Sequence, residues 1–512
     1  MASNPLTLKL LINKQSNHVI YAESGKDFVD ILLSFLTMPV SSIIRLTTRH
    51  PKIGSLNSLY ESVEDLDVHY MQTKACKNML LHPRSAAEEQ YENLVIDIDE
   101  DTNPTEYYVC PLWVCAYRTH CLVSTVANAK CRCGQVMHRR LYRKKGDDGI
   151  DGRDGGFVKG GTGFMISDDL NVFPVSTSKS LELIRKAAVS ESTVLEQRNV
   201  NVGRREVLHL LNCMLHSKTP LTDVFLEEKD MVDGINLDLN VMNLNLKDVG
   251  VDFNDIAQPQ TEKEIETETD SKKVSLKLLM SKSNNRVLYA EGGEEFPNLL
   301  FSFLTFPLGS IVKCLGGTTT MGCLDNLYKS VEGLNNNDYM RSEECKAMLL
   351  DPKLALHFGC QNQLLQIEEQ VPYQPTLSVC ESCNCFGPYI KDYGNWICSH
   401  EVSKVQLSTL NPKFPNVVME HGGAFMAGPA MFMVTDELIV KPLSPISGIS
   451  LLNGLNINNN DLEERFVKVG KEEALSILKA SLISKTVLSD VFSSKKPQQK
   501  YIMLYGKKFP FP

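Results

Sequence analysis

The sequence has no long hydrophobic run. Its longest uninterrupted apolar stretch, Ala424 to Val434, has 11 residues and contains Pro429, whereas a membrane-spanning helix needs about 20 residues. The first 12 residues also lack the basic and then apolar pattern of a secretory leader. We therefore expect no membrane-spanning segment and no secretion, and we expect an intracellular protein, cytoplasmic or nuclear.

The chain also lacks an excess of positive charge. It has 53 Lys and Arg against 62 Asp and Glu, a formal net charge of −9, and residues 227–273 alone account for −8 of it. Nucleic-acid binding depends largely on the neutralisation of phosphates, so we expect nucleic acid not to be a partner. One segment differs: His138 to Lys145 has five basic residues in eight, which we interpret as a solvated loop rather than a nucleic-acid site.

Disulfide scaffolding is not expected. The 15 cysteines are an odd number, and without a secretory leader this favours a reducing compartment, where clustered cysteines more often bind metal.

The chain contains an internal repeat. Residues 8–43 and 276–311 are identical at 20 of 36 positions without a gap, at an offset of 268. The same order of matches continues through CKNMLLHP and CKAMLLDP to SKTPLTDVF and SKTVLSDVF, which end at Phe225 and Phe492. We predict two homologous tandem units, residues 1–226 and 274–493, each a separate hydrophobic body. An acidic linker (227–273), disordered at least over 257–273, and a C-terminal tail (494–512) complete the domain prediction.

Hydrophobic periodicity predicts the same elements in each unit. In the first, residues 6–22 alternate as a β-hairpin, and apolar residues at helical spacing follow between Phe28 and Leu36. Residues 76–80 predict another helix, 164–175 a second hairpin, and 207–215 a C-terminal helix. Strands and helices do not alternate as β-α-β units, so the expected class is α+β, with β-hairpins, packed helices and a cysteine-rich, zinc-ribbon-like insertion in each unit.

These motifs carry a resemblance. The opening LKLLI…VIYAE…FVDILLSFLT, the CKNMLLHP and CRCGQVM segments and the closing SKTPLTDVF are similar to the plant "domain of unknown function 674" family, over both units. The resemblance implies a plant source and a tandem architecture, and it implies no known activity. Where the first unit has CRCG, the second has CSHE.

The strongest candidate site is a cysteine cluster in the first unit. Cys110 and Cys115 are separated by four residues, and Cys131 and Cys133 by one; Gly134, which follows, would permit a tight turn behind the second pair. Two such pairs predict a closed, structural zinc site with four protein ligands. The second unit offers a weaker set, Cys380, Cys383, Cys398 and His400, with Cys385 and, in the first unit, Cys121 to spare. Free thiols on a loop, or redox chemistry at paired thiols, are the alternatives.

No catalytic signature is found. HExxH, GxSxG and a P-loop are absent, and no set of His, Ser, Asp or Lys recurs in both units. The shared acids, Asp168 with Asp169 and Asp436 with Glu437, are typical of turns. We therefore expect a non-enzymatic binding or interaction module with structural zinc and an unknown protein partner. The alternatives are an enzyme with a site between the units and a thiol-based redox sensor.

Overall fold

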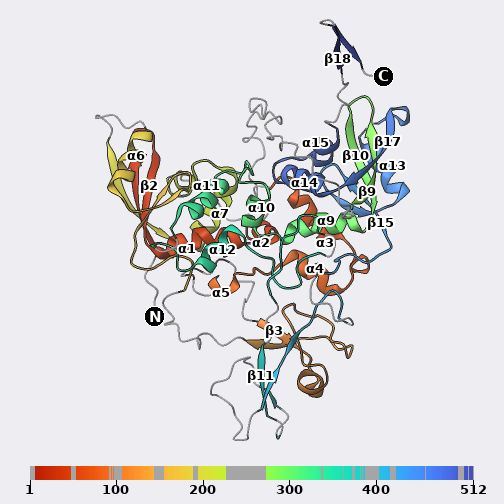
Figure 1. Cartoon of the computed structure of the whole chain (residues 1–512), viewed down its shortest axis with the longest axis horizontal. Coiled ribbons are helices and arrows are strands. Elements are labelled where there is room, and N and C mark those ends of the chain that lie inside the picture. Colours follow the sequence, from red (N-terminus) through yellow and green to blue (C-terminus); the bar gives the residue numbers. More distant parts are fainter. Residues whose placement is uncertain are drawn as a thin grey trace.

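A computed structural model describes most of the chain. The described residues are 6–47, 53–91, 94, 96, 98, 106–142, 155–187, 194–226, 273–335, 338–360, 363–371, 375–380, 382, 385–386, 403–415, 422–455, 457–493, 501–504 and 507–510. The predicted linker lies outside them except for its last residue, Lys273. Helices and antiparallel sheets are both abundant (Figure 1), consistent with the α+β class.

Two five-stranded antiparallel sheets have the same strand order. The first is β7-β6-β2-β1-β8, and the second is β16-β15-β10-β9-β17. The strands of the first sheet are β1 (Leu6–Asn13), β2 (His18–Ser24), β6 (Phe164–Ser167), β7 (Val172–Pro174) and β8 (Leu195–Val202). Those of the second are β9 (Val274–Ser281), β10 (Arg286–Gly293), β15 (Met431–Thr435), β16 (Val440–Pro442) and β17 (Leu462–Val469). The predicted hairpins are therefore confirmed, and β1 buries every second residue, Leu8, Leu10 and Ile12, as the alternation requires.

The helices also correspond along the two halves of the chain. The first half has α1 (Lys26–Ser34), a 3-10 turn η1 (Phe35–Thr37), α2 (Val40–Leu46), α3 (Leu56–Asp65), η2 (Val68–Tyr70), α4 (Lys74–Leu81), α5 (Glu88–Tyr91), α6 (Thr177–Lys186), α7 (Arg204–His216) and α8 (Pro220–Phe225). The second half has α9 (Glu295–Thr305), α10 (Leu308–Cys314), α11 (Leu324–Gly333), α12 (Glu343–Leu350), α13 (Pro445–Gly454), η4 (Asn459–Asp461), α14 (Lys471–Ile483) and α15 (Val487–Phe492). The helices predicted around 28–36, 76–80 and 207–215 are confirmed as α1 with η1, α4 and α7. None of the helices in the described residues combines the length and hydrophobicity needed to cross a bilayer.

The two halves exchange helices. Figure 1 shows α3 and α4 on the side of the second sheet, and α11 and α12 on the side of the first. The Oγ of Ser62 in α3 accepts a hydrogen bond of 2.9 Å from Val440 N in β16, and the Oγ of Ser330 in α11 accepts one of 2.9 Å from Val172 N in β7. Each sheet is therefore completed by a helix from the other half of the chain.

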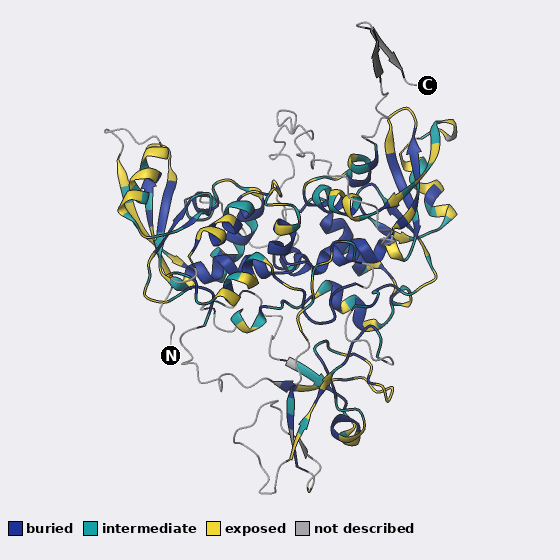
Figure 2. Ribbon diagram, viewed as in Figure 1, coloured by how far each residue is buried: buried dark blue, intermediate teal, exposed yellow. Residues whose placement is uncertain are grey.

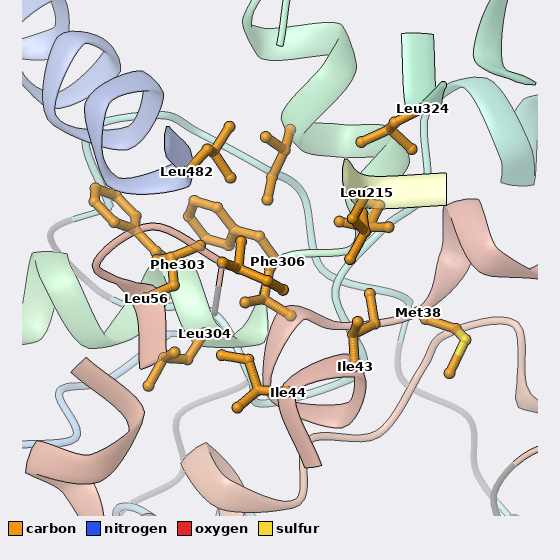
Figure 3. Packing of buried hydrophobic residues seen from close by; sticks show 14 of the residues in the cluster. Met38, Ile43, Ile44, Leu56, Leu215, Phe303, Leu304, Phe306, Leu324 and Leu482 are labelled. Atoms are coloured by element: carbon orange, nitrogen blue, oxygen red, sulfur yellow. The ribbon is translucent and has the colours of Figure 1, made fainter. Parts of the chain in front are cut away.

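The exchange continues at the centre of the molecule, where the halves meet almost symmetrically. Val40 N donates to Phe306 O at 3.1 Å, and Leu308 N donates to Met38 O at 3.1 Å. Figure 3 shows side chains of both halves packed here, among them Ile43, Ile44 and Leu56 of the first half and Phe303, Phe306 and Leu482 of the second. Buried residues form a continuous band across both halves (Figure 2).

The prediction of two separate hydrophobic bodies is wrong. One cluster of buried residues extends from Leu8 in β1 to Phe492 in α15 and includes helices of both halves. The helices α3 and α11 are each packed against elements of the other half of the chain. Apolar burial has no preference for neighbours in sequence, so the sequence pattern alone did not reveal this exchange.

Buried polar groups secure the same exchange. The carboxylate of Asp30 in α1 accepts hydrogen bonds from Phe157 N and Val158 N, at 2.7 and 2.9 Å. Asn298 in α9, at an offset of 268, accepts from Phe425 N and Met426 N, at 2.9 and 3.0 Å. The two segments held in this way, 157–158 and 425–426, also form isolated β-bridges with the opposite half of the chain. Val158 pairs with Met340, and Met426 pairs with Met71.

Two glycines let the backbones of the halves approach closely. Gly54 has a φ of +45°, and a Cβ added to it would lie 2.3 Å from the Ser481 carbonyl oxygen; Gly322, at φ +34°, would place one 2.3 Å from the Met214 carbonyl oxygen. Both conditions exclude a larger residue, because the left-handed φ strains it and the facing backbone cannot move aside.

Substitution of Gly54 with alanine should therefore weaken the junction between the halves. Strain at positive φ and overpacking against backbone together predict a loss of roughly 3 kcal/mol in the free energy of unfolding. The measurement is urea unfolding followed by circular dichroism, with Gly25→Ala as the control, because nothing lies within 4 Å of a Cβ at Gly25. Equal stability of the two variants would contradict the account.

A third body, the cysteine lobe, lies apart from both sheets, at the bottom of Figure 1. We define it as residues 106–142 with the described residues between 375 and 410. Its strands are β3 (Glu106–Val109), β4 (Leu122–Ser124), β5 (Arg139–Tyr142), β11 (Thr376–Cys380), β12 (Cys385–Phe386), β13 (Ser403–Gln406) and β14 (Ser408–Thr409).

The C-terminal tail forms a separate hairpin of β18 (Tyr501–Leu504) with β19 (Lys507–Pro510).

The lobe is built from both halves of the chain. Strand β14 pairs in parallel with β4, in the order β14-β4-β3-β5. A small core joins Val109 and Val123 to Leu377, Val379 and Leu407. The middle segments of both halves therefore share one core, and the cysteine-rich insertion expected in the second half lies largely outside the described residues.

Candidate metal centre

The four candidate ligand cysteines of the first half converge in the cysteine lobe. Cys110 follows β3, and Cys115 begins a short π-helix (Cys115–Thr119). Cys131 and Cys133 lie in the hairpin that precedes β5. The Cys110 and Cys133 sulfurs are 3.5 Å apart, the Cys115 and Cys131 sulfurs are 3.4 Å apart, and all four lie within 4.8 Å of one another.

The hairpin that carries Cys131 and Cys133 is a tight knuckle. Asn128 N donates to Met137 O at 3.2 Å, and Met137 N donates to Ala129 O at 2.9 Å. Gly134 N then donates to Cys131 O at 2.8 Å with φ at +87°. Open space surrounds the Cβ position of Gly134, so glycine is favoured there by its conformation and not by crowding. This is the turn that the sequence predicted behind the second cysteine pair.

Most of the cluster is shielded from water. Cys110, Cys115 and Cys131 are buried, at 0, 5 and 2 % exposure, whereas Cys133 is exposed. The apolar neighbours are Leu122, Ala129, Met137 and Leu410, the last of which comes from the second half. Three of the four cysteines are therefore packed among apolar side chains, and Cys133 is exposed to solvent.

Three of these thiols have shifted pKa values. Burial raises the pKa of Cys110 to about 11 and also raises the pKa of Cys115. Burial acts the same way on Cys133, but hydrogen bonds from Gln135 N–H and from the neighbouring thiols outweigh it and lower its pKa. Four thiolates so close together repel one another unless a cation neutralises them. The arrangement can therefore hold a soft divalent cation or stay largely protonated.

The candidate set of the second half is mostly outside the described residues. Cys380 ends β11, is fully buried, and lies opposite Cys385 in the register of β11 with β12. Cys383, Cys398 and His400 are not among the described residues, so this ligand set stays a prediction. Cys121 lies outside the four-sulfur cluster.

The shared acids hold helices against the sheets. Asp168 accepts hydrogen bonds from Thr222 N at 2.9 Å and Thr222 Oγ1 at 2.6 Å, which fixes the start of α8. Asp436 accepts from Ser489 N and Ser489 Oγ, both at 2.8 Å, and fixes α15 in the same way. The reading of these acids as turn residues is incomplete, because each also anchors a distant helix.

The anchoring carboxyl of Asp168 should make stability depend on pH. Burial raises its pKa to about 6 from a usual 3.8, so the folded chain binds this proton more tightly than the unfolded chain. Its contribution to the free energy of unfolding is then fully present below about pH 4 and is lost as the pH rises through 6, by at most about 3 kcal/mol. Asp168→Asn, which keeps an acceptor for Thr222 N, should flatten the stability profile of the wild type between pH 4 and 6 in urea titrations. Parallel profiles would contradict this assignment.

The structure also shows what the sequence patterns missed. Residues 376–380 and 403–407 alternate apolar and polar residues and could have been read as strands. No local pattern indicated that these strands belong beside the cysteines of the first half. Leu377, Val379 and Leu407 pack on Val109 and Val123 of the first half, and hydrophobic periodicity does not report such distant contacts.

Comparison with known proteins returned one family. The sequence model described as "Protein of unknown function (DUF674)" matches residues 2–472 and, separately, residues 460–510. No curated protein and no solved structure matches the chain.

Proposed function

Since the chain belongs to the DUF674 family, described as a protein of unknown function, we propose a function from its geometry: an intracellular, non-enzymatic binding protein whose cysteine lobe is held together by structural zinc. Cys110, Cys115, Cys131 and Cys133 are the proposed ligands. The observation that carries the proposal is the convergence of their four sulfurs within 4.8 Å.

The donor set supports zinc over other metals. Zinc in structural sites is bound tetrahedrally by four thiolates at about 2.3 Å, which places neighbouring sulfurs somewhat under 4 Å apart. The paired distances of 3.4 and 3.5 Å are close to that spacing. Calcium and magnesium prefer oxygen ligands, and no carboxylate belongs to the cluster among the described residues. With four protein ligands, no coordination position is left for a substrate, and this supports a structural role.

The small hydrophobic core of the cysteine lobe is a second argument for structural zinc. Its larger core consists of eight buried residues, and bodies with so small a core are usually stabilised by metals or disulfides. None of the twelve cysteines whose side chains the structure describes forms a disulfide. A bound zinc ion would fix β3, the π-helix and the knuckle together, and through Leu410 it would also fix the strands of the second half.

We also propose that the chain consists of two homologous copies, residues 1–226 and 274–493, joined by 227–273 and followed by the tail 494–512. The identical strand orders of the two sheets and the paired contacts of Asp30 and Asn298 support this division. In this proposal the copies are separate in sequence and intertwined in space.

Metal analysis of the full chain tests the zinc proposal. Protein purified in the presence of a thiol reductant should contain about one zinc ion per chain. Replacement by Co²⁺ should give the visible absorption of a tetrahedral thiolate site. Cys121→Ser is the matched control, because this cysteine belongs to the lobe but not to the cluster, and it should keep its metal. A wild-type chain without metal would refute the proposal.

A thiol-based redox sensor is the second candidate. The exposed Cys133 has a lowered pKa and lies 3.5 Å from the Cys110 sulfur, and an accessible thiolate beside a second thiol is the usual arrangement for oxidation to a disulfide. The same preparation distinguishes the two candidates. Zinc predicts metal with four protected thiols, whereas the sensor predicts metal-free protein that loses two free thiols per disulfide when peroxide is reduced to water.

A further inference from the structure

Strand β17, at the edge of the second sheet, carries an exposed aromatic side chain. Phe466 is 78 % exposed. Within the described residues β17 pairs with β9 alone, so its outer edge has no other strand of this part of the chain beside it. Figure 1 places β17 and α13 at the outer side of the second half. An open edge strand is a template for a further strand, and this one presents a large apolar side chain as well.

The corresponding edge strand of the first sheet lacks this feature. Strand β8 lies beside β1 as β17 lies beside β9, and it has Asn199 where β17 has Phe466. At the neighbouring positions of the same face β17 has Glu464 and Lys468, whereas β8 has an amide side chain at both. The alternate positions, which point to the other face, are identical in the two strands: Glu, Arg, Val and Val. The two strands therefore differ on one face only.

The helix on this face is uncharged. Glu464 lies opposite Leu279 in the register of β17 with β9, and Leu279 packs with Leu451 of α13. Helix α13 therefore lies on the face of the sheet on which the two edge strands differ. It has no charged residue, whereas α6, its counterpart on the first sheet, has four in ten. Two of its apolar side chains, Ile446 and Ile449, are 77 and 59 % exposed.

We propose that a second molecule of this chain binds here. The surface, which we call the β17 face, consists of Ile446, Ile449, Glu464, Phe466 and Lys468. The two β17 strands run antiparallel about a two-fold axis at Phe466, which brings the two phenylalanine rings together. Each Glu464 then lies opposite Lys468 of the other molecule. Aromatic pairs and pairs of opposite charge stabilise neighbouring strands, and a two-fold interface requires a surface that is complementary to itself.

The charges of β17 fit strand pairing better than protection from it. Edge strands often carry charges that repel a second strand, and like charges should then meet when the strand pairs with itself. In the register proposed here, Glu464 meets Lys468, and Arg465 lies opposite Val467. Arg465 is also bound to Glu463 of its own strand, at 3.6 Å. An exposed phenylalanine at the centre of the strand is the opposite of a protective residue.

This inference goes beyond the proposed function and does not depend on it, because no residue of the cysteine lobe takes part. A membrane surface fits the β17 face less well than a second molecule does. Helices that lie on membranes carry Lys and Arg on their polar face, whereas α13 has no charged residue.

Sedimentation equilibrium of the full chain tests the proposal. The wild type should form a dimer of twice 57.3 kDa, with a dissociation constant on the order of 10⁻⁶ M. Phe466→Asn introduces the residue of the first half and removes two rings from each dimer, so the dissociation constant should rise at least about a hundredfold. Leu181→Asn is the matched control, because Leu181 is 49 % exposed on α6, and it should dimerise like the wild type.

A charge exchange tests the register. Glu464→Lys alone and Lys468→Glu alone each place like charges opposite one another twice, and each should weaken the dimer about tenfold. An equimolar mixture of these two variants restores opposite charges in the mixed dimer, which should form about as tightly as the wild-type dimer. Circular dichroism confirms that each variant is folded, and the charge exchange decides alone if Phe466→Asn fails to fold.

Four results would overturn the proposal. One is a dimer that Phe466→Asn leaves unchanged, and another is a mixture of the two charge variants that does not dimerise. A third is a monomeric wild type well above micromolar concentration that dimerises only after deletion of residues 494–512, which would show that the tail covers the β17 face. The fourth is a monomer under all these conditions, whether or not it binds phosphatidylcholine vesicles through Phe466.

Discussion

Cleavage of the folded chain between residues 227 and 272 should leave its two halves together as one complex. Residues of both halves share the central core, with Phe306, Leu56 and Leu482 completely or almost completely buried. Exposure of only six such side chains costs about 9–18 kcal/mol, which is comparable to the entire stability of a typical domain, about 5–15 kcal/mol. A protease site inserted in this segment, followed by size-exclusion chromatography with light scattering, should therefore show one particle of unchanged mass.

The first half expressed alone provides the complementary measurement. Residues 1–226 lack α11 and α12, which cover the first sheet, and their own α3 and α4 would have no second sheet to cover. We expect this fragment to be insoluble or to pair with a second copy, and we expect co-expression with residues 273–493 to restore a soluble complex. Two compact monomers that elute separately would contradict the exchange of helices.

Replacement of Cys131 by serine should release the metal and unfold the cysteine lobe, but not the rest of the molecule. Structural zinc sites contribute roughly 10–16 kcal/mol of apparent binding free energy in small peptides, and this energy is coupled to local folding. The large core contains no ligand cysteine, so its thermal transition should change little. We expect loss of about one zinc ion per chain and rapid proteolysis within residues 106–142.

Cys121→Ser again serves as the control and should resist proteolysis like the wild type. Limited proteolysis with mass spectrometry locates the cuts, and differential scanning calorimetry follows the main body. Retention of metal by Cys131→Ser would exclude Cys131 as a ligand. Collapse of the main transition would show that the lobe supports both sheets, contrary to the separate cores observed.

Some features of the candidate metal site can be predicted from local sequence, and others cannot. Spacing identified Cys110, Cys115, Cys131 and Cys133, and Gly134 indicated the turn between strands, because chelating pairs and left-handed turns are short-range features. Their convergence required Cys110 and Cys133, 23 residues apart, to meet, and the Leu410 that covers them comes from the other half of the chain. Neither relation has a periodicity that can be read along the chain.

The sequence by itself determined the elements and their repetition. The alternation of Leu8, Leu10 and Ile12 fixed the inner face of β1, and the spacing from Phe28 to Leu36 fixed a helix, because side-chain direction follows backbone geometry within a few residues. Only the tertiary structure decided which half each helix covers. Ser62 and Ser330 occupy equivalent positions in the similar helices α3 and α11. Each accepts a hydrogen bond from a strand of the other half, although its own half has an equivalent strand. A helix packed on the sheet of its own half and a helix packed on the sheet of the other half would make nearly identical contacts. The two arrangements differ in the path of the connecting segments, and the burial pattern of a single helix is the same in both.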